Sequence, residues 1–336
     1  MTSNKAKTFH HIPLSVLDLS PINEGSNPGE SLANSTDLAQ HVDKWGFNRY
    51  WLAEHHNMPG IASSATSVLI GHIAGATNRI RVGSGGIMLP NHASLVIAEQ
   101  FGTLETLYPG RIDLGLGRAP GSDQATAFAL RRTLNMSVED FPLQVEELQG
   151  YFAGTERVHA VPGEGLDIPI WLLGSSDFSA QLSAHKGLPF SFASHFSPNY
   201  TIPALHLYRE RFQPSKSLEK PYAMLGVNVI AADTDEEAQY LATSHQQQFL
   251  NIRNGRPAKL QPPIEDTKNA WSEMEQAAVA SSMESPATIV GGPETVKRGL
   301  ESFLEQTKAD EFIISSQIFD HQARLHSYEV ISDLMD

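Results

Sequence analysis

The sequence predicts an α/β protein, and the architecture that fits it best is a (β/α)8 barrel. Three observations favour this fold class. Short apolar, β-rich runs alternate with longer helical patterns, eight of these runs are each followed by a helix, and no shift in composition divides the 336 residues. Repeated strand–helix units imply parallel strands with right-handed crossovers. Eight units favour a closed barrel, with an open doubly wound sheet as the alternative.

The strands are predicted from runs rich in Val, Ile, Leu and aromatic residues, such as "RYWLA" and "YAMLGVNVIA", which are bounded by loop-forming residues. In chain order they cover residues 14–18, 49–53, 80–89, 111–117, 168–174, 189–194, 222–231 and 311–316.

The helices are predicted from apolar residues at helical spacing, as in "SLVIAEQFGTLETLY", and from signals at their ends. "SSDFSAQLSAHKG" begins with capping serines and ends with glycine, and "TDEEAQYLATSHQQQFL" has an acidic first turn. The predicted helices cover residues 30–45, 65–76, 94–108, 138–152, 175–187, 198–212, 234–250, 291–307 and 321–334.

Two stretches interrupt this alternation. Residues 153–167 form a small excursion after the fourth helix, and residues 251–285 are too long and too polar for a simple connection. We therefore expect one barrel domain over residues 1–336, with an insertion between strands seven and eight.

Composition excludes several classes of function. The chain has 24 basic and 38 acidic residues, a net charge of −14, so it would repel nucleic acid and anionic membranes. It contains no cysteine, which excludes disulfides, cysteine-ligated zinc and thiol nucleophiles. No secretory signal is visible, and no apolar run reaches the about 20 residues that span a bilayer. We expect a cytoplasmic protein without nucleic-acid or membrane partners.

In a barrel of this kind, catalytic residues lie at the carboxyl ends of the strands. Those ends carry Asp18, Glu54, His55, His56, Ser84, Gly85, Gly86, Gly115, Gly117, Arg118, Pro120, Gly174, Ser175, Ser176, Ser194, His195, Ser316 and Gln317. Polar loops begin at strand ends in any protein, which is the alternative explanation. The concentration of these residues nevertheless predicts a site at this face.

The third strand ends in Ser84, Gly85 and Gly86, within "GSGG". Glycines in a strand mark a bulge or a place where a ligand approaches the backbone closely. A flat aromatic cofactor needs such a surface. Packing against a neighbouring helix explains the glycines equally well.

A phosphate site is predicted from Arg118 and from the turn at Gly174, Ser175 and Ser176. "GLGRAPG" misses the dinucleotide fingerprint, because its third glycine comes one position late and a proline interrupts the helix start. Arg118 is therefore interpreted as a bidentate phosphate ligand. "LLGSSDFS" ends a strand and starts a helix, so its N–H groups and hydroxyls can bind an anion. A structural ion pair and ordinary N-capping are the alternatives.

The two adjacent histidines of "EHH" suit proton transfer better than metal binding. Neighbouring side chains on a strand point to opposite sides, so His55 and His56 would not readily chelate one ion. The chain also lacks H-E-x-x-H, and no H-x-H lies on the first strand. We expect no metal, and we assign acid–base chemistry to this element.

"WLAEHH", "RVGSGGIMLPNHASLVIAEQFGTLETLYPGRIDLGLGRAPG" and "ADTDEEA" together resemble the flavin-dependent luciferase-like monooxygenases, the family that contains the bacterial luciferase alpha subunit. The match is densest over residues 14–121, and it extends in strand–helix order over nearly the whole chain. One departure is Gly117, where luciferase has a reactive cysteine. We do not expect light emission.

The resemblance implies a (β/α)8 barrel with an insertion between strands seven and eight, reduced FMN as co-substrate and O2 as oxidant. By motif, His55 would be the catalytic imidazole, with Glu54 or His56 orienting it. Gly85–Gly86 would form a cis peptide beneath the flavin ring, next to Ser84. The FMN phosphate would bind to Arg118 and to the turn at Gly174, Ser175 and Ser176.

We therefore expect a monooxygenase that oxygenates a small organic substrate, with a separate flavin reductase as partner and a homodimer as the assembly. Residues 251–285 and the loop 119–137 would close over the site. A deazaflavin-dependent oxidoreductase and a non-catalytic flavin-binding protein are the alternatives.

Overall fold

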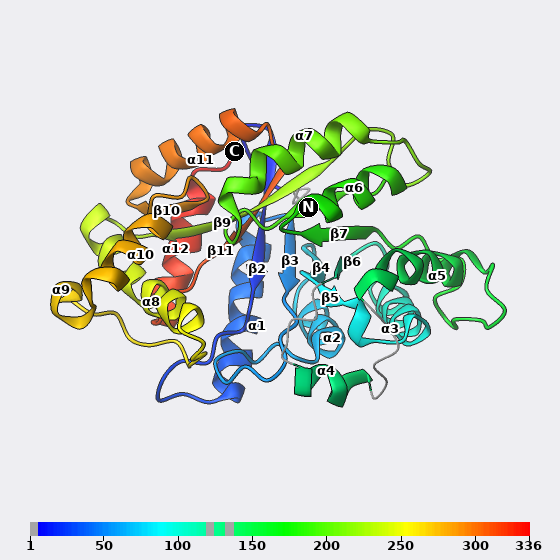
Figure 1. Ribbon diagram of the computed structural model, residues 1–336, viewed down its shortest axis with the longest axis horizontal. Helices are drawn as coiled ribbons and strands as arrows, with labels where there is room; N and C mark the ends of the chain where they lie inside the picture. Colours follow the sequence, from blue (N-terminus) through cyan, green and yellow to red (C-terminus); the bar gives the residue numbers. More distant parts are fainter. Residues whose placement is uncertain (1–5, 119–123, 132–137) are drawn as a thin grey trace.

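The computed structural model describes residues 6–118, 124–131 and 138–336, and its centre is a closed barrel of eight parallel strands (Figure 1). The barrel strands are β2 Ile12–Asp18, β3 Arg49–Leu52, β4 Arg81–Ser84, β6 Ile112–Gly117, β7 Ile170–Gly174, β8 Phe190–Phe192, β9 Ala223–Ala231 and β11 Glu311–Ser315. Each pairs with the next barrel strand, and β2 pairs with both β3 and β11, which closes the ring. The predicted barrel is confirmed, and the open sheet is wrong.

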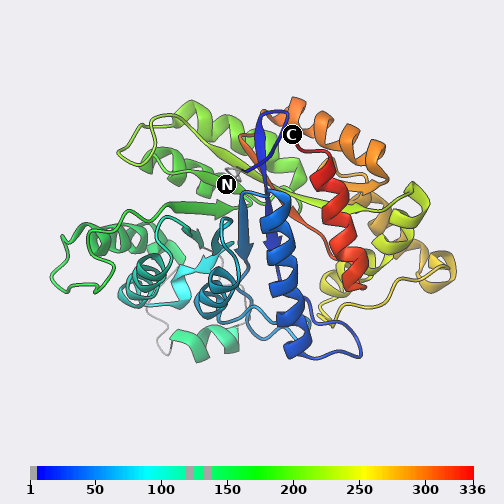
Figure 2. The same cartoon turned by 180° about the vertical axis from the view of Figure 1, so that it is seen from behind.

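The helices lie around this barrel. Those in the described ranges are α1 Pro28–Trp45, α2 Thr66–Ala76, α3 Ser94–Leu107, α4 Gln124–Arg131, α5 Phe141–Ala153, α6 Asp177–Lys186, α7 Thr201–Arg211, α8 Asp235–Arg253, α9 Thr267–Ala270, α10 Glu273–Met283, α11 Pro293–Thr307 and α12 His321–Asp333. Seen from behind, α1 and α12 pack side by side (Figure 2). Of the helices described, none combines the length and apolar character needed to cross a membrane.

Short elements that the sequence did not predict complete the fold. β1 Thr8–Phe9 pairs with β2, β5 Ile87–Met88 with β6, and β10 Thr288–Gly291 with β9. Three 3-10 turns are described, at Leu89–Asn91, Val138–Asp140 and Pro198–Tyr200.

The structure corrects three expectations. The expected strand 80–89 divides into β4 and β5 at Gly85–Gly86, whose peptide bond is cis. Helix α4 lies inside the segment expected to be a loop. The insertion, which contains α9 and α10, ends in strand β10 rather than leading directly into a helix, because the nine-residue β9 extends far enough to pair with a further strand.

The amino end of the barrel is closed by buried charges. The guanidinium of Arg49 lies 2.6 Å from a carboxylate oxygen of Asp113 and 3.1 Å from one of Glu311. Burial alone would raise the pKa of Asp113, but Arg49 and Arg81 hold it below its ordinary value. Above these groups the indole of Trp51 donates a hydrogen bond to Asp113 at 3.2 Å. The interior is therefore filled at this end, and space remains at the carboxyl ends of the strands.

Replacing Thr234 by alanine is expected to lower the free energy of unfolding by about 1 kcal/mol. Thr234 caps α8, because its hydroxyl accepts a hydrogen bond from the N–H of Glu237 at 3.1 Å. Thr234→Ser keeps the acceptor and should retain most of the stability. Urea unfolding followed by circular dichroism measures both variants. An alanine variant as stable as the wild type would show that the cap contributes nothing.

Candidate active site

A cavity of about 260 Å³ opens at the carboxyl ends of the barrel strands. Of the residues to which the resemblance assigns a role, it brings together seven, from four different strand ends: His55, Gly85, Gly86, Arg118, Gly174, Ser175 and Ser176. These residues lie up to 121 positions apart in the sequence, between His55 and Ser176, and only the closed barrel places them on one surface. The cavity is therefore the candidate active site.

Much of the cavity lining is apolar. Leu17, Trp51, Leu173 and Ile313 line the cavity together with the glycine backbone. At Gly86 an added Cβ would lie 2.8 Å from the carbonyl oxygen of Gly115, which is too close for any side chain. This contact shows that packing against β6 requires the glycine. Because Gly85 and Gly86 also line the cavity beside large apolar groups, their backbone suits the face of a planar ring. Sequence analysis missed the four apolar residues, since nothing in their spacing separates them from ordinary core.

One end of the cavity is suited to an anion. The guanidinium carbon of Arg118 lies 4.0 Å from the ring centre of Phe178, which holds the cation in place. Phe178 lies in the first turn of α6, whose N-cap is Ser176, and the first N–H groups of that helix have no partner within the helix. Gly174 is needed because an added Cβ would collide with Ser179. An arginine and a helix start together favour a phosphate group.

His55 contributes a neutral imidazole to the cavity. Its backbone N–H donates to the carbonyl of Ser63 at 3.1 Å, while its Nδ1 is buried and has no hydrogen-bond partner in the described part of the chain. Burial lowers the pKa of His55 below its ordinary value, outweighing the opposite effect of the Glu54 carboxylate. A neutral imidazole that lines a cavity can exchange a proton with a ligand.

Glu54 and His56 are not among the residues that line the cavity. Glu54 is buried, and Nε2 of His56 and Nε2 of His92 each lie 2.9 Å from its Oε1. The other carboxylate oxygen accepts from the N–H of Met88 at 3.3 Å. Burial raises the pKa of Glu54, but the hydrogen bonds from the two histidines bring it below its ordinary value. The three side chains could also hold a metal ion, since their ligand atoms lie within 4.8 Å of one another. Their catalytic roles stay predictions.

Two other strand-end residues are committed to the framework. The hydroxyl of Ser84 donates to the carbonyl of Gly115 at 2.8 Å and accepts from its N–H at 3.0 Å, so it joins β4 to β6. Asp18 forms a buried ion pair with Arg324 at 2.8 Å. His195, by contrast, lines the cavity. Pro120 and much of the loop 119–137 lie outside the described residues.

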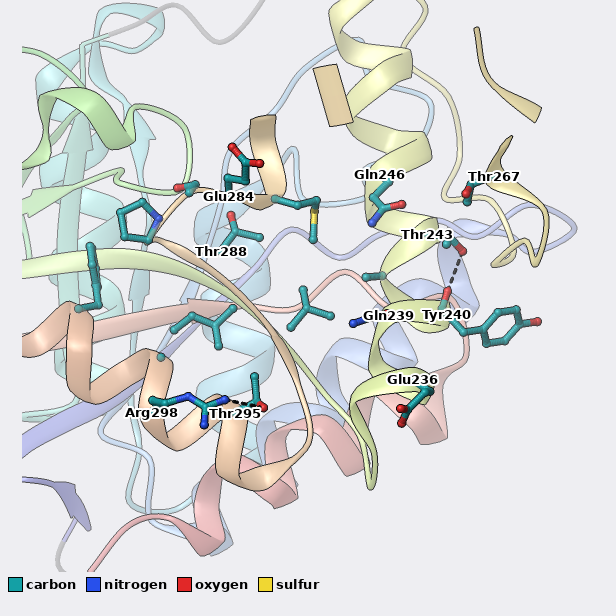
Figure 3. A pocket seen from close by; sticks show the side chains of 18 of the residues that line it. Glu236, Gln239, Tyr240, Thr243, Gln246, Thr267, Glu284, Thr288, Thr295 and Arg298 are labelled. Carbon is teal, nitrogen blue, oxygen red and sulfur yellow. Dashed lines mark hydrogen bonds between the residues drawn. The ribbon is translucent and has the colours of Figure 1, made fainter. Parts of the chain in front are cut away.

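A larger cavity, of about 900 Å³, lies outside the barrel against α8, β10 and α11 (Figure 3). Its polar groups are partly committed to local bonds. Thr243 donates to the carbonyl of Tyr240 at 2.7 Å, and Arg298 donates to Thr295 at 3.2 Å. Charges of both signs, Glu236 and Arg298 among them, line it. The predicted site residues converge on the smaller cavity, which we take as the site on chemical grounds.

Comparison with known proteins gives a family and close relatives. The sequence model of the luciferase-like monooxygenases matches residues 12–311. A luciferase-like monooxygenase of Escherichia coli (strain K12) is 55% identical over 328 residues, which cover 97% of each chain. An N-acetyl-S-alkylcysteine monooxygenase of Bacillus subtilis (strain 168) is 34% identical over 331 residues, 96% of this chain and 98% of that one.

Two solved structures are also similar. Apo-MsnO8 has a TM-score of 0.87 at 34% identity, and the match covers 96% of this chain and 98% of that one. The oxygenating constituent of 3,6-diketocamphane monooxygenase from Pseudomonas putida, solved in complex with FMN, has a TM-score of 0.71 at 16% identity, covering 96% and 97%. At that identity the second match shows the shared fold alone.

Proposed function

The chain belongs to the luciferase-like monooxygenase family, and we propose that it uses reduced FMN and O2 to oxygenate a small organic substrate. One observation carries the proposal. A single cavity joins the glycine backbone at Gly85–Gly86, the cation of Arg118 and the imidazole of His55, whose Nδ1 has no partner among the described residues. These are the three features that a flavin mononucleotide and its proton transfers require.

The residues present fit FMN. The ring would lie against Gly85 and Gly86, where the backbone faces the cavity, and the phosphate would bind to Arg118 and to the Ser175–Ser176 turn at the start of α6. When bound in its reduced form, FMN supplies the electrons with which O2 is activated.

His55 would hold or release a proton on its imidazole, whose buried Nδ1 has no partner among the described residues. The Glu54–His56–His92 bonds would fix the loop that carries it, so Glu54 would act on His55 through the backbone and through its charge. The apolar lining and the insertion would exclude water from the cavity.

Relatives support FMN and an organic substrate without deciding either. A protein of the same fold was solved with FMN, while other structures of this fold are named F420-dependent, at 14–15% identity. A relative at 34% identity is named for N-acetyl-S-alkylcysteine, which favours thioethers as candidate substrates. The deazaflavin oxidoreductase remains the second candidate, on the strength of the shared fold.

We also propose two partners. A separate flavin reductase would supply reduced FMN. A homodimer would bury apolar side chains that are exposed on neighbouring helices, Val68 on α2 and Val96 and Leu107 on α3. Sedimentation of the purified protein tests the dimer.

Mixing the protein anaerobically with reduced FMN, then adding O2 and a panel of aldehydes, ketones and thioethers, tests the proposal. We expect one O2 to be consumed per oxygenated product, which carries one added oxygen atom. A chain that binds reduced deazaflavin but not FMN, and transfers hydride without consuming O2, would establish the second candidate instead. Tight binding of oxidised FMN without turnover would indicate a non-catalytic flavin protein.

A further inference from the structure

A second chamber, of about 550 Å³, adjoins the candidate cofactor cavity. His195 and Phe196 line both spaces, so they form the wall between them. The chamber lies over the mouth of the barrel, where Asn228 of β9 and Ser315 of β11 face it, and α10 of the insertion forms its far side. A ligand in this chamber would reach the cofactor cavity past His195.

One face of α8 forms a wall of this chamber. His245, Gln248, Phe249, Ile252 and Arg253 all line it, at spacings of three and four residues that place them on a single helix face. From His245 to Arg253 the helix rises roughly 12 Å. The chemistry of the wall changes along this length, from neutral hydrogen-bonding groups through apolar groups to a cation.

In the inner part of this wall, the side-chain oxygen of Gln248 has no hydrogen-bond donor within the described residues. Gln248 is 7% exposed, and its Oε1 is buried without a partner in the described part of the chain. Leaving such a buried acceptor unpaired is unfavourable. Nearby, His245 bonds to Gln317 and remains neutral, because burial lowers its pKa to about 4. A neutral N–H group of a ligand would satisfy Gln248.

The outer part carries an unpaired cation. Arg253 is exposed at the carboxyl end of α8, and no ion pair joins it to another residue within the described ranges. The other charged residue of the chamber, Glu284, stands at the end of α10 and also faces the larger cavity of Figure 3. In a chain of net charge −14, a free arginine beside a chamber is a specific place for an anion.

We propose that this chamber binds the substrate, and that it selects a small organic acid bearing an amide. The carboxylate forms an ion pair with Arg253, and the amide N–H donates a hydrogen bond to Oε1 of Gln248. The apolar reacting end lies between Phe249 and the wall formed by His195 and Phe196. This inference rests on the proposed function for the identity of the neighbouring cofactor. The contacts to Gln248 and Arg253 are independent of it.

Calorimetric binding of matched probes tests the carboxylate contact without requiring turnover. N-acetyl-S-benzylcysteine and its carboxamide differ only in charge at one end. Wild-type protein should bind the acid about tenfold more tightly than the carboxamide, the effect of about 1.4 kcal/mol. Arg253→Gln should remove this preference, whereas Arg256→Gln, an exposed arginine three residues further on, should keep it. Equal affinity of the two probes for the wild type would overturn the proposal.

The amide contact is tested with an N-methylated probe, which lacks the N–H. Wild-type protein should bind it about fivefold more weakly than N-acetyl-S-benzylcysteine, by the loss of one hydrogen bond. Gln248→Met, of similar size, should bind both alike. A methionine variant that keeps the full preference would remove Gln248 from the site.

FMN binding, measured separately by fluorescence quenching, distinguishes failure of the proposed function from failure of the proposed substrate class. Failure of FMN to bind refutes the proposed function, yet the probe affinities still decide whether the chamber selects an amide acid. Normal FMN binding with no discrimination between probes refutes the substrate class alone.

Discussion

Replacing His55 by alanine is expected to slow substrate oxygenation by about 100- to 10,000-fold, the range that a positioned acid–base group contributes. The reason is the loss of the imidazole that follows β3 and lines the cavity, where its Nδ1 has no hydrogen-bond partner among the described residues. FMN affinity should stay nearly intact, because the phosphate end and the glycine backbone are untouched. Single-turnover kinetics with reduced FMN separates the two effects.

Two comparisons sharpen this test. His55→Gln keeps a hydrogen-bonding side chain but does not take up a proton at neutral pH, so it should be nearly as slow as the alanine variant. His159→Ala, on the surface and paired with Glu164, should behave as wild type. The pKa of His55 is lowered, so the neutral base persists below the usual range for histidine, and the rate should fall only at lower pH. Undiminished turnover of His55→Ala would remove this residue from the mechanism.

Replacing Arg118 by alanine is expected to weaken FMN binding by about 10- to 100-fold, the effect of losing a hydrogen-bonded charge. Arg118 is the cation of the cavity, and its stacking on Phe178 restricts it to the anion-binding end. Arg118→Lys should give an intermediate affinity, since an ammonium keeps the charge but loses the planar fork. Equilibrium titration of flavin fluorescence gives all three constants.

Riboflavin provides the control for this prediction, because it lacks the phosphate. Wild-type protein should prefer FMN to riboflavin, and Arg118→Ala should lose that preference while its riboflavin affinity changes little. If the variant weakens both ligands by the same factor, Arg118 supports the cavity in general and does not bind the phosphate.

The barrel and much of the site could be predicted because a strand–helix repeat determines where the strand ends must lie. Gly85–Gly86, Arg118 and the Ser175–Ser176 turn come from three different units, yet a closed ring places them on one face. The family match over residues 12–311 confirms the resemblance that the same segments carry.

The features that could not be predicted depend on contacts with residues far away in the sequence. Glu54 and His56 are adjacent in the motif to His55, but the position of Glu54 follows from His92, 38 residues away. Strand β10 has only four residues, and its "TIVG" merges with the glycines before α11. The helical spacing of α8 was visible, but which of its faces meets a chamber depends on how the insertion packs.

The most direct test of the central claim is a crystal structure of the protein with FMN bound. The proposed arrangement predicts the phosphate between Arg118 and the start of α6, with the ring against Gly85–Gly86 and His55 beside it. A flavin seated in the cavity outside α8 and α11, or one whose phosphate faces away from Arg118, would contradict it.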